Sequence, residues 1–446
     1  MTDILRAAIQ RLLPQARTDL ETLVRIPSVA FPGFDHGQVQ ASAEAVAALC
    51  REVGMPDVKI VAAGGQPAVI AKIPAPPGAP TVLLYAHHDV QPAGRPEDWN
   101  TEPFEPTQIG DRLYGRGCAD DKAGVVAHLT AIRAFDGRPP VGVILFIEGE
   151  EEFGSGSLPD LLAEYVDDLR ADVIVIADSV NWDIGVPSLT TSLRGLVDCY
   201  VEVAVLDHAV HSGMWGGPIP DALTALSRLL ATLHEADGSV AVKGLHQGET
   251  SQVDYPEERF RAESGVLDGV QLIGRGSLTE RMWYGPAIAV TGIDCPSVRE
   301  ASNTLVPSAR AKVSMRIAPG QDPAAALEAL VEHLESHAPW GARVTVTRGE
   351  KGAPCVIGTD GPAHEAARLA LREAWEGVEP IHLGVGGSIP FIAEFAETFP
   401  QAEILVTGVE DPDSRAHGAN ESLHLGEFAR VCLAESLLLA SLAPRR

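Results

Sequence analysis

Four short apolar runs, each followed at once by histidine or acidic residues, constrain this chain more than any other feature of its sequence. The runs are Val82–Ala86, Val141–Ile147, Val173–Ala177 and Ile404–Thr407. Their length and continuous apolar character are typical of strands that are buried on both faces of a sheet. Helical patterns lie between or beside them, over Ala123–Phe135 and Ala363–Glu376. This alternation predicts an α/β fold with a doubly wound, mainly parallel sheet.

The middle of the chain has a different pattern. Apolar and polar residues alternate over 197–205 and again over 309–317, which is the period of a strand exposed on one face. Helical patterns near Ile219–Leu233 and Pro323–His337 accompany these strands. Such a set predicts a smaller α+β domain of ferredoxin-like type, with an irregular stretch over Lys243–Glu280. We expect residues 193–354 to form this insert and residues 1–192 and 355–446 to form the larger, discontinuous domain.

The residues that follow the four apolar runs can bind metal ions or transfer protons. In chain order they are His87, His88 and Asp89, then Glu148, Glu150, Glu151 and Glu152, then Asp178, and finally Glu410, Asp411, Asp413 and His417. Because ligands of doubly wound sheets gather beyond the carboxyl ends of the strands, we expect these side chains to share one site. Histidine and carboxylate ligands without cysteine indicate a catalytic divalent-metal site. Their number exceeds the need of one zinc ion and fits a two-metal hydrolase.

Each of these groups, taken alone, has a more ordinary explanation. A run of glutamates is usually a solvated surface, and a histidine after a strand is usually a core or surface residue. Their shared position at four strand ends is what favours a metal site. We expect the other histidines not to bind metal, and we expect His333 and His337, on a predicted helix, to be exposed.

Composition and charge argue against other classes of protein. The chain has 34 Lys and Arg against 61 Asp and Glu, a formal net charge of −27, so we expect no nucleic-acid partner and no anionic membrane surface. No apolar run approaches the ~18 residues of a membrane helix, and the first residues do not resemble a signal peptide. The six cysteines are scattered without a CxxC pair, which is typical of reduced thiols. We therefore expect a cytoplasmic protein.

As a set, these motifs resemble those of the di-zinc metallopeptidase family that includes cytosolic dipeptidases, carnosinases, aminoacylases, succinyl-diaminopimelate desuccinylase and glutamate carboxypeptidases. The matching stretches are Leu84–Pro92, Leu113–Lys122, Glu148–Ser155, Ile176–Asp178, His211–Gly213, Gly386–Pro390 and Ala416–Gly418. They run across almost the whole chain in the order of the family. The resemblance is greatest to the dipeptidase–carnosinase branch.

The resemblance implies two divalent metal ions, with Zn²⁺ as the first candidate and Mn²⁺ or Co²⁺ as alternatives. It implies that His87 and Asp178 bind one ion and that Glu152 and His417 bind the other. Asp120 would bridge the two ions.

The same resemblance implies the catalytic groups. Asp89 would lie behind His87 and fix its ring, as carboxylates behind metal-binding histidines do. Glu151 would be the general base for a water molecule that bridges the metals. A cis peptide bond between Asp120 and Asp121 is also implied.

The insert corresponds to the lid domain of the family, which commonly forms homodimers. His211 matches a lid histidine that stabilises the reaction oxyanion in the active site of the partner. Asn303 and Arg316 match lid positions that hold the substrate, and the guanidinium of Arg316 would bind a terminal carboxylate. Gly387 and Ser388 match a loop that lines the same pocket.

The resemblance implies hydrolysis of a peptide bond next to a free carboxylate, above all in dipeptides. One departure leaves an alternative, because Gly384–Val385 stands where dipeptidases often carry Arg-Glu. An N-acyl or N-carbamoyl amino acid amidohydrolase, or a desuccinylase, would use the same machinery. A non-catalytic binding protein of this fold is disfavoured, since Glu151 has no structural reason to be present.

Overall fold

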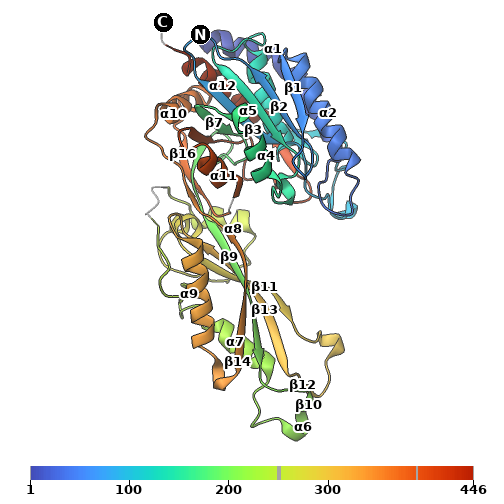
Figure 1. Cartoon of the computed structure of the whole chain (residues 1–446), viewed down its shortest axis with the longest axis vertical. Helices are drawn as coiled ribbons and strands as arrows, with labels where there is room; N and C mark the ends of the chain where they lie inside the picture. The colour runs from blue at the N-terminus through green and yellow to red at the C-terminus, as the bar shows by residue number, and fades with distance from the viewer. Residues whose placement is uncertain (1, 249–252, 388–389, 445–446) are drawn as a thin grey trace. The chain divides into compact units, whose positions relative to one another are not determined.

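The computed structural model describes residues 2–248, 253–387 and 390–444 (Figure 1). The chain divides into two compact units. The first unit comprises residues 1–191, 357–383 and 394–446, and the second comprises residues 192–356 and 384–393.

The first unit is built on a mixed β-sheet. Its strands, in spatial order, are β1 (Asp57–Val61), β2 (Ala68–Ile73), β6 (Gly142–Glu148), β3 (Thr81–His87), β7 (Val173–Ile176), β17 (Glu403–Val406) and β8 (Ser188–Leu193), and β16 (Ile381–Val385) also pairs with β8. The four predicted apolar runs are the central strands β6, β3, β7 and β17, and they are parallel to one another. The α/β prediction is confirmed, although β1, β2 and β8 pair antiparallel with their neighbours.

Helices cover both faces of this sheet, which explains why its central strands are apolar throughout. Val82, Leu84 and Ala86 of β3 share one core cluster with the helices on one face. These helices are α1 (Thr2–Val24), α2 (Gly37–Glu52), α3 (Lys122–Arg133), α10 (Pro362–Ala374) and α12 (Leu425–Ser441). On the other face, the rings of Tyr85 and Phe146 pack against Phe395 of α11 (Pro390–Thr398).

Shorter elements complete the first unit. A small antiparallel sheet has the order β18–β5–β4 and carries the loops that lead into the site. These elements are β4 (Thr107–Ile109), β5 (Arg112–Tyr114), β18 (Ser422–His424), α4 (Leu158–Glu164), α5 (Val166–Leu169) and the 3₁₀ turns η1 (Pro96–Asp98) and η2 (Glu151–Phe153).

The second unit contains a four-stranded antiparallel sheet with helices on one face. Its strands, in spatial order, are β11 (Ala287–Asp294), β13 (Ser308–Ile317), β9 (Gly195–Ala204) and β14 (Arg343–Gly352), and its helices are α7 (Ala222–Ala231) and α9 (Pro323–Ser336). The chain order β9-α7-β11-β13-α9-β14 and this strand order are those of a ferredoxin-like fold. The alternating pattern is explained because every second residue of β9 and β13 faces the helices.

Several short elements belong to the second unit. β10 (Val210–His211) pairs with β12 (Thr304–Leu305), and α6 (Ser212–Trp215) follows β10. This ribbon lies beyond the end of β13 at which Ser308 pairs with Ala204 (Figure 1). The other short elements are α8 (Glu257–Ser264), the π-helical turn η3 (Glu280–Tyr284), η4 (Val298–Glu300), η5 (Pro339–Gly341) and β15 (Cys355–Val356), which pairs with the last residues of β8. Among its described residues, the stretch expected to be irregular therefore contains one α-helix, α8.

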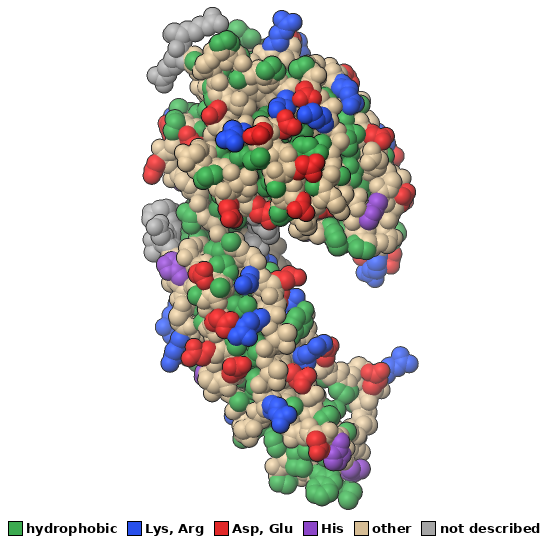
Figure 2. All heavy atoms as spheres, in the orientation of Figure 1, with side chains coloured by type: hydrophobic (Ala, Val, Ile, Leu, Met, Phe, Trp, Pro, Cys, Tyr) green, Lys and Arg blue, Asp and Glu red, His purple; other side chains and the backbone are tan. Residues whose placement is uncertain are grey.

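The described surface carries charges of both signs. Figure 2 shows red acidic and blue basic side chains interspersed on the face in view of each unit. Mixed charges of this kind favour solubility. Among the described helices, none has both the length and the hydropathy required to cross a bilayer.

Candidate metal centre

His87 lies at the carboxyl end of β3 and is buried. Its Nδ1 lies 3.1 Å from the carbonyl oxygen of Asp89 and 3.4 Å from the carboxylate atom Oδ1 of the same residue. Because a carbonyl oxygen can only accept, Nδ1 carries the proton and donates it. Nε2, which lies 3.1 Å from Oδ1 of Asp120, is then the ring atom that faces a possible metal ion, as is usual for a ligating histidine.

Asp120 lies between two histidines. Its Oδ1 is 3.1 Å from Nε2 of His87, and its Oδ2 is 3.1 Å from Nε2 of His417. The peptide bond between Asp120 and Asp121 is cis, as the resemblance implied. The two oxygens of one buried carboxylate thus face two potential ligands, which is the arrangement expected of a bridging residue.

The turn η2 brings Glu151 and Glu152 to the same place. The backbone N–H groups of both residues donate to the carboxylate of Asp89, each over 3.1 Å. Oε2 of Glu152 lies 3.1 Å from Nε2 of His417 and accepts a hydrogen bond of 2.8 Å from the side chain of Gln91. Asp89 therefore does more than the sequence predicted, since it contacts His87 and also holds the backbone of the two glutamates.

Two overlapping groups of side chains could each hold a metal ion, and both contain His87. The ligand atoms lie within 4.8 Å of one another in the group His87, Glu151 and Asp178 and in the group His87, Asp120 and Glu152. All five residues predicted as ligands therefore meet in one place, because His417 contacts two members of the second group. Glu151, predicted as the base, also lies within reach of a metal position.

The acidic side chains of this centre have shifted pKa values that indicate a place for positive charge. Burial, and then the negative charge of Asp178, raise the pKa of Glu151 well above its usual range, and burial raises the pKa of Asp178 to about 7. Hydrogen bonds to Asp120 and Glu152 raise the pKa of His417 to about 11. Crowded carboxylates that are at least half-buried are stabilised by a cation. The donor set of imidazole nitrogens and carboxylate oxygens fits divalent metal ions.

The predicted substrate residues lie in the second unit, except that Ser388 falls outside the described residues. His211 and Asn303 lie together, because the N–H of Ser212 donates to the carbonyl oxygen of Asn303 over 2.9 Å. Both are exposed. Arg316 is half-buried near the opposite end of β13, where it pairs with Leu196 of β9.

Gly387 lies in a loop that is held near this second end. Nε of Arg194 donates to the carbonyl oxygen of Gly386 over 3.1 Å, and the same guanidinium donates to the carbonyl oxygens of Arg281 and Gly285. Within the second unit, the predicted substrate residues therefore form two separate groups, at opposite ends of one strand.

Three residues that contact the centre were not singled out from the sequence. Gln91 binds Glu152, and its position inside the stretch Leu84–Pro92 was a signal for it. Arg116 and Glu421 form a buried ion pair next to Asp120. Of these two, only Arg116 lay within a recognised motif.

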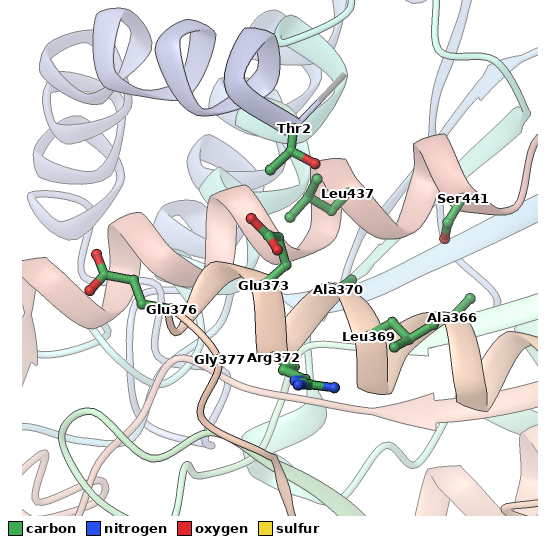
Figure 3. Close-up of a pocket in the computed structure, with 10 residues that line it drawn as sticks. All are labelled: Thr2, Ala366, Leu369, Ala370, Arg372, Glu373, Glu376, Gly377, Leu437 and Ser441. Carbon is green, nitrogen blue, oxygen red and sulfur yellow. The ribbon is translucent and has the colours of Figure 1, made fainter.

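A separate cavity of about 680 Å³ lies between α10, α12 and the first residue of α1 (Figure 3). Its lining mixes apolar residues such as Leu369 and Leu437 with Arg372, Glu373 and Glu376. It shares no residue with either group of candidate metal ligands. The cavity and the metal centre are therefore distinct features of the first unit.

Comparison with known proteins identifies the family. Residues 83–439 match the sequence model described as Peptidase family M20/M25/M40. The chain belongs to this family. The M20 match spans both the candidate ligands and the residues of the second unit. The predicted resemblance is therefore confirmed, and so is the expectation of a metal-dependent peptidase.

Individual relatives agree with the M20 family. The chain is 37% identical over 370 residues to a cysteinylglycine-S-conjugate dipeptidase from Corynebacterium striatum, covering 81% of each chain. It is 28% identical over 379 residues to the Beta-Ala-His dipeptidase of Homo sapiens, covering 80% of this chain and 74% of that one. The fold matches the crystal structure of human carnosine dipeptidase 1 with a TM-score of 0.82 at 24% identity, covering 99% and 98% of the two chains. Family and ligand chemistry together indicate divalent metal ions.

Proposed function

We propose that this chain is a dipeptidase that acts with two divalent metal ions, with Zn²⁺ as the first candidate and Mn²⁺ or Co²⁺ as alternatives. The observation that carries the proposal is the position of Asp120, whose two carboxylate oxygens face His87 and His417 in a chain of the M20 family. The names of its relatives support dipeptides as the substrate class.

The residues that would hold the two ions are the predicted ligands. They are His87 and Asp178 for one ion, Glu152 and His417 for the other, and Asp120 for both. Bound there, the ions would supply positive charge that polarises the scissile carbonyl group and lowers the pKa of water. The chain itself supplies the orientation of these ligands, through Asp89 behind His87 and Gln91 on Glu152.

Glu151 is the proposed general base. Burial and the nearby charge of Asp178 raise its pKa, so its carboxylate holds a proton more firmly than an exposed glutamate does. Such a group can accept a proton from water and pass it to the leaving amine. The hydrogen bond from its backbone N–H to Asp89 keeps the base at the end of β6.

Arg316 is the proposed binding group for the terminal carboxylate of the substrate, because a guanidinium can bind a carboxylate with two parallel hydrogen bonds. Arg194 lies close enough that the positive charge of Arg316, after burial, lowers the pKa of Arg194 to about 10. Two guanidinium groups near the Gly386–Gly387 loop favour an anionic group at this place. The proposal therefore includes substrates with a free carboxylate.

The positions of His211 and Arg316 support a homodimer formed through the second unit. The ladder between β13 and β9 runs from Ser308 to Arg316, a span of roughly 26 Å at ~3.3 Å per residue, and His211 lies beyond the Ser308 end. A dipeptide spans only ~7 Å. If both residues act on one substrate, His211 must come from the partner subunit.

We also propose a cytoplasmic location, which the six free cysteines support.

A second candidate, hydrolysis of N-acyl or N-carbamoyl amino acids, is favoured by Gly384. A Cβ atom at this position would lie 2.5 Å from Cβ of Trp283, so the buried ring leaves no room for a side chain here. The chain therefore has no charged side chain at position 384 to recognise the amino end of a dipeptide. The same metal centre would serve both substrate classes.

Purified protein is expected to hydrolyse dipeptides faster than N-acetyl and N-carbamoyl amino acids, and only with divalent metal bound. Rates on a matched panel with the same carboxyl-terminal residue, together with elemental analysis, measure both properties.

Treatment with a chelator should remove about two metal ions per chain, abolish hydrolysis and lower the unfolding midpoint, because bound ligands stabilise the folded state. Adding metal back should restore all three. Faster rates on the N-acyl compounds would favour the second candidate, and undiminished hydrolysis after complete metal removal would refute both.

Replacement of Arg316 by alanine should lower kcat/KM for free-acid dipeptides by about 10²-fold, because the charged hydrogen bonds to the carboxylate are lost. The variant should act on dipeptides and on their carboxyl-terminal amides at similar rates. The wild type should prefer the free acids. Steady-state kinetics on both substrate forms measure the effect.

Arg310→Ala is the matched control for this prediction. Arg310 projects from the same face of β13 as Arg316, since the two differ by an even number of residues, and it pairs with the exposed Asp294. Its loss should leave kcat/KM within about twofold, because exposed ion pairs contribute little. A wild type that cleaves acids and amides equally well would contradict the role of Arg316.

A further inference from the structure

Glu421 is a buried carboxylate that binds the backbone of the segment leading to Asp120. Its side chain has no exposed surface. Oε1 accepts hydrogen bonds from the N–H groups of Ala119, over 2.9 Å, and of Asp120, over 3.1 Å. Oε2 accepts one from the N–H of Gly117, over 3.0 Å. One carboxylate thus accepts hydrogen bonds from three backbone N–H groups within residues 117–120.

Arg116 connects the same carboxylate to the loop that carries His417. Its Nη1 donates to Oε2 of Glu421 over 2.6 Å, and its Nη2 donates to the carbonyl oxygen of Gly418 over 2.9 Å. The guanidinium is almost completely buried, with 1% of its residue surface exposed. Through this pair, the backbone beside His417 and the backbone of Asp120 are held by a common group.

We propose that Glu421, together with Arg116, is a positioning residue that sets the spacing between Asp120 and His417 for metal binding. The inference rests on the two-metal centre proposed above. The Glu421 carboxylate accepts hydrogen bonds from Arg116 and from backbone N–H groups of the 117–120 segment, so it acts on the ligands through these groups. Residues that orient metal ligands in this way typically change metal affinity by about 10- to 100-fold.

Stability alone is a poor explanation for this pair. A buried ion pair often contributes little to folding, because both charges lose their hydration. A second buried pair, Arg112 with Asp411, already joins β5 to the loop before His417 through two bonds of 3.0 Å. That second pair makes no bond to the backbone of Asp120. The contribution specific to Glu421 is therefore its hydrogen bond to the backbone N–H of Asp120.

The substitution Glu421→Gln separates positioning from folding. The amide keeps the shape of the side chain but replaces one acceptor oxygen by an NH₂ group, which would face N–H donors. The dissociation constant for Zn²⁺, measured by competition with a chromophoric chelator, should rise by about 10- to 100-fold. Excess Zn²⁺ should then restore most of kcat, because the ligands themselves are intact.

Glu427→Gln is the matched control. Glu427 is equally buried and accepts bonds from Trp375, Gly185 and Arg430, but it contacts neither the Asp120 segment nor the His417 loop. Its replacement should lower the unfolding midpoint of the metal-free protein about as much as Glu421→Gln does, with the Zn²⁺ affinity unchanged. Equal losses of Zn²⁺ affinity in the two variants would overturn the inference.

Arg116→Lys provides a second test that does not depend on the folding of Glu421→Gln. Lysine can keep the ion pair with Glu421 but not both guanidinium bonds, so the bond to Gly418 is lost. The affinity for one of the two Zn²⁺ ions should fall by about 10-fold while the other is retained. Unchanged affinity for both ions in Arg116→Lys would overturn the inference and leave the proposed function standing. A wild-type protein that binds no Zn²⁺, Mn²⁺ or Co²⁺ would overturn both.

Discussion

Replacement of Glu151 by glutamine is expected to lower kcat for dipeptide hydrolysis by about 10³-fold while both metal ions stay bound, because general-base catalysis contributes ~10²- to 10⁴-fold. Glutamine has nearly the size of glutamate but cannot accept a proton from water. The KM should change little, since the side chain is not proposed to bind the substrate. Steady-state kinetics and elemental analysis of the same preparation measure both parts.

The metal content of the Glu151→Gln variant distinguishes a role as base from a role as metal ligand. Oε2 of Glu151 lies 3.9 Å from Nε2 of His87, and Glu151 forms a group of potential ligand atoms with His87 and Asp178. Its position alone is therefore compatible with a ligand as well as with a base. If Glu151 were a ligand, its replacement would weaken metal binding together with turnover.

Glu152→Gln is the natural control, since it changes the neighbouring residue in the same turn and in the same way. Glu152 contacts His417 and is a proposed ligand, so this variant should lose metal affinity, and added metal should restore part of its activity. Glu151→Gln should show no such recovery. Near-normal turnover in Glu151→Gln, or recovery with added metal, would contradict its role as base.

The parts of the site that could be predicted from the sequence are those fixed by strand ends. His87 ends β3 and Asp178 follows β7, and a continuous apolar run is a local signal for such buried strands. Once the strands are known to be parallel, their carboxyl ends must meet at one edge. The convergence of these side chains with Glu151 and Glu152 therefore followed from local pattern and general topology, before any contact was known.

The contacts that orient this centre could not be predicted in that way. Arg116 and Glu421 lie 305 positions apart in the chain, and no periodicity links them. The antiparallel strands β1, β2 and β8 were not predicted from the sequence for a related reason. Short segments of mixed polarity carry little local signal, and their pairing depends on the strands beside them. The expectation that His333 is exposed is wrong, because its side chain is buried and shares a hydrogen bond with Thr232, a residue about a hundred positions away in the chain.

Packing explains why this chain has glycine at position 384, where dipeptidases often carry a charged residue. The sequence alone showed the difference but not its cause. The missing charged pair was evident from the residues Gly384 and Val385 alone. Its physical cause is Trp283, whose side chain occupies the space that a Cβ at position 384 would need. Trp283 comes from the π-helical turn η3, about a hundred residues earlier in the chain, so substitution at position 384 alone cannot restore a charged group.

Replacement of His211 by alanine is expected to lower kcat by about 10²- to 10³-fold, which is the usual effect of losing one donor to the reaction oxyanion. Nδ1 of His211 accepts a hydrogen bond from the N–H of Gly213 over 3.1 Å. The neutral ring therefore carries its proton on Nε2, which makes Nε2 a donor to a developing negative charge. The exposed His208, three positions earlier, is the control, and His208→Ala should leave kcat unchanged.

Mixed dimers test whether His211 acts in the partner subunit. His211→Ala and Glu151→Gln homodimers should each be nearly inactive, but a mixed dimer has one site with an intact Glu151 from one subunit and an intact His211 from the other. Random exchange makes half of the dimers mixed, with one working site each, so about one quarter of the wild-type activity should return. If His211 served its own subunit, every site in the mixture would lack one of the two groups. The absence of recovery after verified subunit exchange would then contradict catalysis across a dimer, and with it the explanation for the separation of His211 from Arg316 along β13.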